Sequence, residues 1–222
     1  MYKTETHLHT AESSFCARIP AEEVVKIYKE EGYHTIIDTV HYNETYFSHI
    51  SEDWDKRIDY MFEGFKKARA LGDQIGLNVL FAIELTLNRT MSDYLIYGIT
   101  EDFLRKNPNL YKLSLSRLVY LCKKNKFLII QAHPYRVGGK MSPLRYRLPL
   151  EIYNGRHNIK PYNDLAVKYA IKHKLIGISG SDFHELDDFR GGILSKNEIK
   201  TIDDFITTVL SRDFEIIPIN NI

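Results

Sequence analysis

Apolar residues along the chain fall into short runs that are separated by amphipathic segments. Residues 1–9 alternate in character and predict a β-strand, and residues 34–40 predict a buried strand. Between them, Pro20 followed by Glu22 and Glu23 is typical of a helix start, because proline lacks an N–H and the helix dipole favours acidic residues. The order strand, helix, strand predicts one right-handed parallel βαβ unit.

The same patterns continue through the rest of the chain. Helices are predicted over residues 52–71, 101–105, 114–124, 162–174 and 202–211. Strands are predicted over residues 78–86, 94–98, 126–132, 148–153, 175–179 and 214–219, and residues 43–50 are predicted to form a loop. The gap 87–93 is too short for a helical crossover, so the strands on either side of it are predicted to form an antiparallel hairpin. This hairpin would place Asp93 beside the end of its first strand.

These elements predict the fold class. No internal repeat, low-complexity tract or linker divides residues 1–222. Seven or eight strands interleaved with helices are typical of a triosephosphate-isomerase (TIM) type barrel. We therefore expect an α/β protein with a distorted TIM-like (β/α)7 barrel that forms a single domain.

Candidate chemistry begins with His7 and His9 in the first predicted strand. Residues two apart in a strand project to the same side, so both imidazoles are expected to point together. Two such imidazoles supply half of a first-row metal site. Taken alone, the pair could equally be two unrelated histidines whose polar atoms are satisfied elsewhere.

Further residues of ligand type lie at the ends of later predicted strands. They are His41, Glu84, His133, Asp182 and His184. The C-terminal ends of barrel strands meet at one face, so we expect these side chains to converge with His7 and His9. Imidazole and carboxylate ligands without cysteine suit Zn²⁺, Mn²⁺ or Fe²⁺. The set exceeds what one four-coordinate ion needs, which predicts at least two ions, with Glu84 or Asp182 able to bridge them.

Composition narrows the possible partners and the compartment. The net charge is +1 and the pI is near 7.8, so no overall field attracts long nucleic acids or an acidic membrane. The sequence has no apolar run of about 18 residues that would span a bilayer and no pattern of a signal peptide. Cys16 and Cys122 do not form a disulfide scaffold. We expect a cytoplasmic protein without a membrane partner, and the sequence does not decide its oligomeric state.

Four motifs in order resemble those of the polymerase and histidinol phosphatase (PHP) superfamily. They are Glu5-Thr6-His7-Leu8-His9-Thr10, Thr39-Val40-His41, Ala132-His133-Pro134 and Gly180-Ser181-Asp182-Phe183-His184, with Glu84 in the place of an intervening family glutamate. The resemblance implies a distorted barrel and phosphoester hydrolysis by a metal-activated hydroxide at a centre of two or three metal ions. It implies that His7, His9, Glu84 and Asp182 ligate one part of the cluster, and that His41, His133 and His184 complete it. Asp182, His184 and His133 are the implied catalytic residues, and Mg²⁺ is a further possible metal.

The chain departs from the family pattern at several positions. Val40 replaces a usual aspartate, and Ser14 and Phe15 occupy positions where a further ligand is common. Glu12 or Cys16 could substitute there, although Cys16 could equally be a small buried residue. Asp93 is the nearest candidate for a ligand that often follows Glu84.

Arginines in loops after the ligand-bearing strands are candidates for holding substrate phosphate. They are Arg18, Arg136 and Arg190, and arginine binds phosphate oxygens through two parallel hydrogen bonds. Each could instead be a solvated surface charge. Asn154 ends a strand and could bond a ligand or a neighbour, whereas Tyr42, Tyr46, Phe47 and Tyr135 could line the pocket or pack in the core.

Three functions remain open. The first is a metal-dependent phosphoesterase acting on a small phosphorylated substrate. The second is a nuclease or nucleotide phosphatase that uses the same centre on nucleic-acid ends. The third is a PHP-like binding domain without catalytic activity, suggested by Val40 and the missing ligand positions.

Overall fold

The computed structural model of the chain describes residues 1–88 and 90–219. Nine strands form one sheet in the order β7-β6-β5-β4-β3-β2-β1-β8-β9. They are β1 (Tyr2–Leu8), β2 (Thr35–Tyr42), β3 (Asn78–Thr86), β4 (Asp93–Tyr97), β5 (Leu128–Gln131), β6 (Leu150–Asn154), β7 (Gly177–Gly180), β8 (Ile193–Ser195) and β9 (Phe214–Ile216). The helices are α1 (Ala21–Glu30), α2 (Glu44–Ser48), α3 (Trp54–Ile75), α4 (Glu101–Lys106), α5 (Leu115–Lys124), α6 (Asn163–His173) and α7 (Ile202–Ser211), with 3₁₀ turns at Leu110–Lys112 and Leu144–Tyr146.

The sheet curls until its first strand and the chain after β7 meet. Leu8 and Phe183 form a parallel bridge across this junction. The Asp182 N–H donates to the His7 carbonyl oxygen at 2.8 Å, and the His9 N–H donates to the Phe183 carbonyl oxygen at 3.1 Å. The result is a nearly closed barrel, so the predicted α/β fold with a distorted TIM-like barrel is confirmed.

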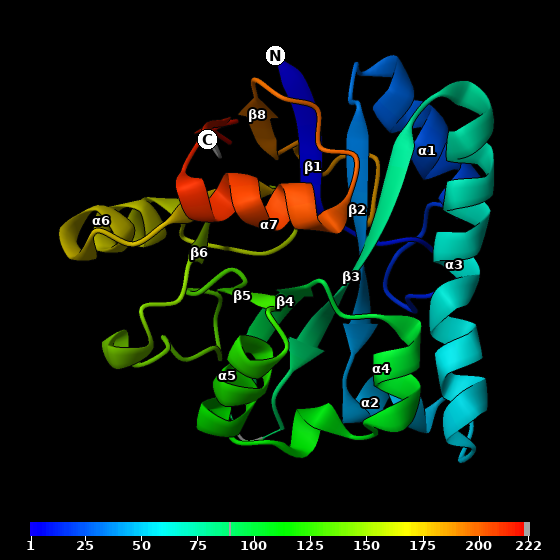
Figure 1. Cartoon of the computed structure of the whole chain (residues 1–222), viewed down its shortest axis with the longest axis horizontal. Helices are drawn as coiled ribbons and strands as arrows, with labels where there is room; N and C mark the ends of the chain where they lie inside the picture. The colour runs from blue at the N-terminus through cyan, green and yellow to red at the C-terminus, as the bar shows by residue number, and fades with distance from the viewer. Residues whose placement is uncertain (89, 220–222) are drawn as a thin grey trace.

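Apolar side chains fill the barrel interior below the candidate site. Ile37, Ala82 and Leu95 face inward from β2, β3 and β4, and α7 adds Phe205 and Val209 to the same buried cluster. In Figure 1, α7 is the orange helix that crosses the middle of the molecule. The interior is therefore a packed core, which restricts polar groups to the remaining end of the barrel.

Helices α1 and α3 pack together on the outside of the barrel, at the right of Figure 1. Val24 and Val25 of α1 and Ala68 of α3 join Leu8 of β1 in a second buried cluster. These apolar side chains of both helices are thus buried. No helix in the described ranges is long and apolar enough to cross a membrane.

The bounds of α3 show why its end is hard to predict. Its start is capped by Asp53, whose carboxylate accepts the N–H groups of Asp55 and Lys56. The helix continues past the predicted end at residue 71 because Gly72 stays helical, whereas Gly76 adopts the left-handed conformation with φ 75° and ends it.

Two segments differ from the prediction. Residues 43–50 were expected to be a loop, but they contain the short helix α2, because the Asn43 side chain accepts the Tyr46 N–H and caps it. Strand β8 was not predicted, since only three residues form it, paired antiparallel with β1. The predicted hairpin of β3 and β4 is confirmed, with Asp93 paired to Thr86.

Asp38 in β2 is fully buried, and neither of its carboxylate oxygens has a hydrogen-bond partner among the described residues. Burial, reinforced by the nearby Glu12 carboxylate, raises the pKa of Asp38 to about 8. The folded protein therefore holds this group protonated at neutral pH, whereas an unfolded chain ionises it near pH 3.8.

We predict that Asp38 makes the protein less stable as pH rises from about 4 to about 8. Because the folded pKa lies above the unfolded value, unfolding releases a proton in this window and becomes more favourable. Replacing Asp38 by Asn should remove this pH dependence. By pH 7, the accumulated loss of unfolding free energy amounts to a few kcal/mol. Urea unfolding at several pH values would measure it, with Asp164→Asn on the surface of α6 as the control. Parallel pH dependences of the wild type and Asp38→Asn would contradict the prediction.

Candidate metal centre

The alternation of side chains in the strands carries polar residues to one end of the barrel interior. Ala82 faces the apolar interior, so Glu84, two residues later in β3, also points inward. His41 pairs with Glu84 across β2 and β3. It lies inside β2 rather than after it as predicted, because β2 continues to Tyr42. The parallel strands thus present their chemistry at their C-terminal ends.

The Glu84 carboxylate lies at the middle of the cluster. Its Oε1 is 2.9 Å from His133 Nε2, and its Oε2 is 2.8 Å from His41 Nδ1. His7 Nε2 and His9 Nε2 lie 3.6 and 3.5 Å from the same carboxylate. Side chains from β1, β2, β3 and the segment after β5 therefore converge as the sequence predicted.

Four buried residues form the first candidate metal site: His7, His9, Glu84 and Asp182. Their ligand atoms all lie within 4.8 Å of one another. His7 Nε2 is 3.1 Å from His9 Nε2, and both nitrogens lie within 3.5 Å of Asp182 Oδ1. Two imidazole nitrogens facing each other between two carboxylates suit a divalent cation, since all four offer electron pairs.

A second candidate site combines Glu84, Asp93 and His133. His133 Nε2 lies 3.8 Å from Asp93 Oδ2, and the hairpin turn brings Asp93 to this position. Glu84 belongs to both sites, so it is placed to bridge two ions.

A third candidate site combines His9, His41 and His184. Cys16 Sγ lies 3.1 Å from His41 Nε2 and 3.1 Å from His184 Nε2. Burial alone would raise the pKa of the Cys16 thiol, but hydrogen bonds with His184 and His41 outweigh it and lower that pKa to about 4. Glu12 does not reach the cluster: it accepts the Ala21 N–H at the start of α1 and lies near Lys67.

Electrostatics within the first candidate site favour the charged forms of Glu84 and Asp182. Burial would raise the pKa of Glu84, but the charge of His7 and hydrogen bonds from His133 and His41 hold it well below its usual range. Burial, together with the neighbouring His41 and His184, lowers the pKa of His9 well below its usual value. His9 is therefore neutral at pH 7 and keeps a free electron pair.

Val40, which replaces a usual aspartate, does not face the cluster. It is buried in the outer apolar cluster with Ile58 and Met61. The orientation of His41 is instead set by the Glu84 carboxylate at its Nδ1. The valine at residue 40 therefore does not disturb the orientation of His41.

Glu151 in β6 is a functional candidate that the sequence analysis missed. Its Oε1 accepts a hydrogen bond from His7 Nδ1 at 2.8 Å, and its Oε2 accepts the His133 N–H at 2.9 Å. Asn154 bonds both Glu151 Oε2 and Asp182 Oδ2 through its Nδ2. A glutamate inside a buried strand was the available signal, because such a charge needs partners.

The three predicted arginines occupy different surroundings. Arg136 lies at the cavity described below, with Nη1 3.6 Å from Asp93 Oδ2. Arg18 is exposed and pairs with Glu185, while Arg190 pairs with Glu31 and lies over the Phe183 ring. The structure therefore brings only Arg136 of these three to the cavity.

Arg156 was not predicted. Its Nη1 lies 3.9 Å from Asp182 Oδ1, and its side chain is 16% exposed. Like Arg136, it follows a strand that ends at the polar face, and this position was the signal in the sequence.

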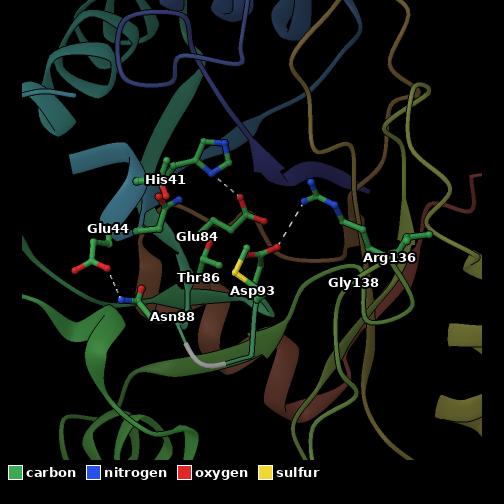
Figure 2. A pocket seen from close by; sticks show the side chains of 12 residues that line it. His41, Glu44, Glu84, Thr86, Asn88, Asp93, Arg136 and Gly138 are labelled. Carbon is green, nitrogen blue, oxygen red and sulfur yellow. Dashed lines mark hydrogen bonds and ion pairs between the residues drawn. The ribbon is translucent and has the colours of Figure 1, made fainter. Parts of the chain in front are cut away.

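A cavity of about 480 Å³ opens beside the cluster. Figure 2 shows His41, Glu84 and Asp93 on one side of it, with Arg136 pointing toward Asp93 from the opposite loop. Asn43, Thr45, Thr86 and Asn88 add amide and hydroxyl groups to its lining. Of the aromatic residues proposed to line a pocket, Tyr42, Tyr46 and Phe47 are buried in the apolar core. Tyr135 instead packs beside Leu150 and Ile152.

Comparison with solved structures places this architecture among known folds. The chain superimposes with a TM-score of 0.70 on a two-domain protein from Bacteroides vulgatus that contains a PHP-like metal-dependent phosphoesterase, at 15% identity over 98% of this chain. It spans 64% of that protein's length. The chain shares the fold of this PHP-like protein. The predicted resemblance is thus confirmed at the level of the fold.

Two further solved structures are similar in fold to this chain. PsfC from Pseudomonas syringae aligns with a TM-score of 0.66 and 18% identity over 93% of this chain and 88% of PsfC. A metal-dependent phosphoesterase from Bifidobacterium adolescentis aligns with a TM-score of 0.55 and 16% identity over 95% of this chain and 96% of its own length. For the Bacteroides and Bifidobacterium proteins, the phosphoesterase activity is itself a prediction.

Comparison of the sequence with known proteins identifies no relative of the chain. No family model matches the chain. No curated protein matches it either.

We predict that Glu151→Gln weakens metal binding without removing a ligand. The amide lacks the charge that orients His7 through Nδ1, and loss of such a partner typically lowers metal affinity about 10- to 100-fold. Titration of the metal-free protein with Zn²⁺ or Mn²⁺ would measure the change, with Glu30→Gln on the surface of α1 as the control. Equal metal affinities in the two variants would show that Glu151 does not influence metal binding.

Proposed function

We propose that the chain is a metal-dependent phosphoesterase that hydrolyses a small phosphorylated substrate. The observation that carries this proposal is the convergence of His7, His9, Glu84 and Asp182 at one end of the barrel, beside an open cavity. The PHP fold and its metal-dependent phosphoesterase neighbours support the same class of reaction. The proposal extends to residues 1–222 as a single hydrolase domain.

The residues of the cluster would hold two divalent ions, Zn²⁺, Mn²⁺ or Fe²⁺, with Mg²⁺ also possible. When bound, such ions supply Lewis acidity and a nucleophile at neutral pH. His7, His9 and Asp182 would hold the first ion, and Asp93 and His133 would hold the second, with Glu84 contributing to both sites. Asp182, His133 and His184 are the proposed catalytic residues because each belongs to one of the three candidate metal sites.

Arg136 is placed to bind the phosphate. Its guanidinium lies at the cavity rim within 3.6 Å of Asp93, so a phosphate there would replace a carboxylate as its partner. Arg156 lies beside Asp182, where its guanidinium helps to compensate the charge of that carboxylate. We do not assign Arg18 or Arg190 to phosphate because both are paired away from the cavity.

The cavity favours a small monoester over a polymer. Its volume of about 480 Å³ accommodates a small metabolite, and its amide and hydroxyl lining suits a polar leaving group. The net charge of +1 provides no overall attraction for a long nucleic acid.

A nucleotide phosphatase is the second candidate because of one surface feature. Phe15 is 55% exposed, and its ring lies 5.2 Å from Tyr46 and 5.9 Å from Tyr60. Such an aromatic surface next to Cys16 could stack a nucleobase. A binding domain without activity is less well supported, because the ligand-type residues are retained and converge. A panel of phosphorylated metabolites, nucleotides and oligonucleotide ends, tested with Mn²⁺, Zn²⁺ and Mg²⁺, would separate the three functions.

We predict that Asp182→Ala abolishes hydrolysis of an aryl phosphate and lowers metal content. The aspartate touches both His7 and His9, so its loss removes one of the two carboxylates of their site, and activity should fall about 100-fold or more. Asp182 has a φ of 49°, so Asp182→Asn is the second variant, since asparagine tolerates this conformation. Exposed Asp187→Asn is the control. Full turnover in both Asp182 variants would exclude the proposed site.

We predict that Arg136→Ala raises KM about tenfold and leaves the metal bound, because a charge-assisted contact to phosphate is lost. Arg136→Lys should recover only part of the loss, since lysine keeps the charge but not the two parallel donors. Steady-state kinetics with metal analysis would test this, with Arg18→Ala as the control. An unchanged KM would show that Arg136 is a surface charge that does not bind the substrate phosphate.

A further inference from the structure

Cys16 lies in the segment between β1 and α1, at the edge of the third candidate site. The segment is held against the barrel, because the Arg18 N–H donates to the His184 carbonyl oxygen at 2.9 Å. Gly64 of α3 has no side chain where Thr10 and Ser13 pack against the helix. This packing fixes the position of the sulfur relative to His41 and His184.

The hydrogen positions on the two imidazoles follow from their partners. His184 Nδ1 lies 2.8 Å from the Asp182 carbonyl oxygen, and His41 Nδ1 lies 2.8 Å from Glu84 Oε2. Both oxygens only accept hydrogen bonds, so each Nδ1 carries the hydrogen. In a neutral imidazole, this leaves an electron pair on each Nε2, and both of these atoms face Cys16.

Three atoms that can each bind a metal ion therefore face one another at this place. Cys16 Sγ lies 3.1 Å from both Nε2 atoms. A cation between the three atoms would satisfy all of them. The 3.1 Å separations are close to the roughly 3.5 Å expected between nitrogen and sulfur ligands of one tetrahedral zinc ion.

A second observation at the same place points to a ligand without using the cysteine. His9, His41 and His184 already offer ligand atoms within 4.8 Å of one another. His9 is fully buried, and its Nδ1 has no hydrogen-bond partner among the described residues. The rings of His9 and His41 stack with centroids 4.1 Å apart, so this buried imidazole lies directly against the site.

We propose that Cys16 is a thiolate ligand of a third metal ion, which it holds together with His41 and His184. This inference rests on the proposed metal-dependent function. The first two candidate sites offer only nitrogen and oxygen ligands, whereas this third site includes a sulfur ligand. A thiolate ligand favours a soft or borderline ion such as Zn²⁺ over Mg²⁺. Binding releases the thiol proton to solvent, and no electron is transferred.

Cobalt substitution tests the proposal by spectroscopy. The full-length protein is stripped of metal and titrated with Co²⁺, which gives a strong near-ultraviolet charge-transfer band only when a thiolate is bound. We expect this band in the wild type and in Cys122→Ala, which removes the other cysteine, a buried residue of α5. We expect no band in Cys16→Ala, and one fewer zinc ion bound per chain. Cys16→His should keep the zinc content of the wild type and still lack the band.

The outcomes separate this proposal from the function on which it rests. A wild-type protein that binds two ions and hydrolyses an aryl phosphate, but shows no thiolate band, would overturn the role of Cys16 alone. Equal zinc contents in the wild type and Cys16→Ala would do the same. If the wild-type protein binds no metal, the proposed metal-dependent phosphoesterase function itself is contradicted.

Discussion

The structure depends on carboxylates that are buried inside a barrel. Glu5, Glu84, Glu151 and Asp182 are all nearly inaccessible to solvent. A charge moved from water into a protein interior costs several kcal/mol unless opposite charges and hydrogen bonds compensate it. Each of these groups is compensated by atoms from a different strand, so the cost of burial is offset only when the barrel is assembled.

Glu5 illustrates how this constraint shapes the fold. Its Oε1 accepts the N–H groups of Thr6, His7 and Ser181. One carboxylate thus connects β1 with the segment after β7. Glu151 plays the same part between β1, β6 and the residues after β5 through His7 and His133. The polar interior is therefore both the candidate site and part of what holds the strands in register.

Much of the candidate site could be predicted because strand periodicity is local. Two-residue spacing places His7 with His9, and a short gap between two strands specifies the hairpin that carries Asp93. Glu151 and Arg156 were missed because their importance comes from partners far away in the chain. Arg18 and Arg190 have the sequence position of phosphate ligands, yet Glu185 and Glu31 pair with them. Only folded loops decide which arginine faces the cavity, and the same holds for Cys16.

The junction that closes the barrel has one further consequence. His7 and His9 stand on one side of it and Asp182 and His184 on the other, while few backbone bonds cross it. An ion bound by residues of both sides would cross-link the first strand to the chain after the seventh. Metal loading and closure of the barrel wall would then be thermodynamically linked. Hydrogen exchange at the amides of His9 and Asp182 would slow as the ions bind, which makes these two amides internal reporters of occupancy.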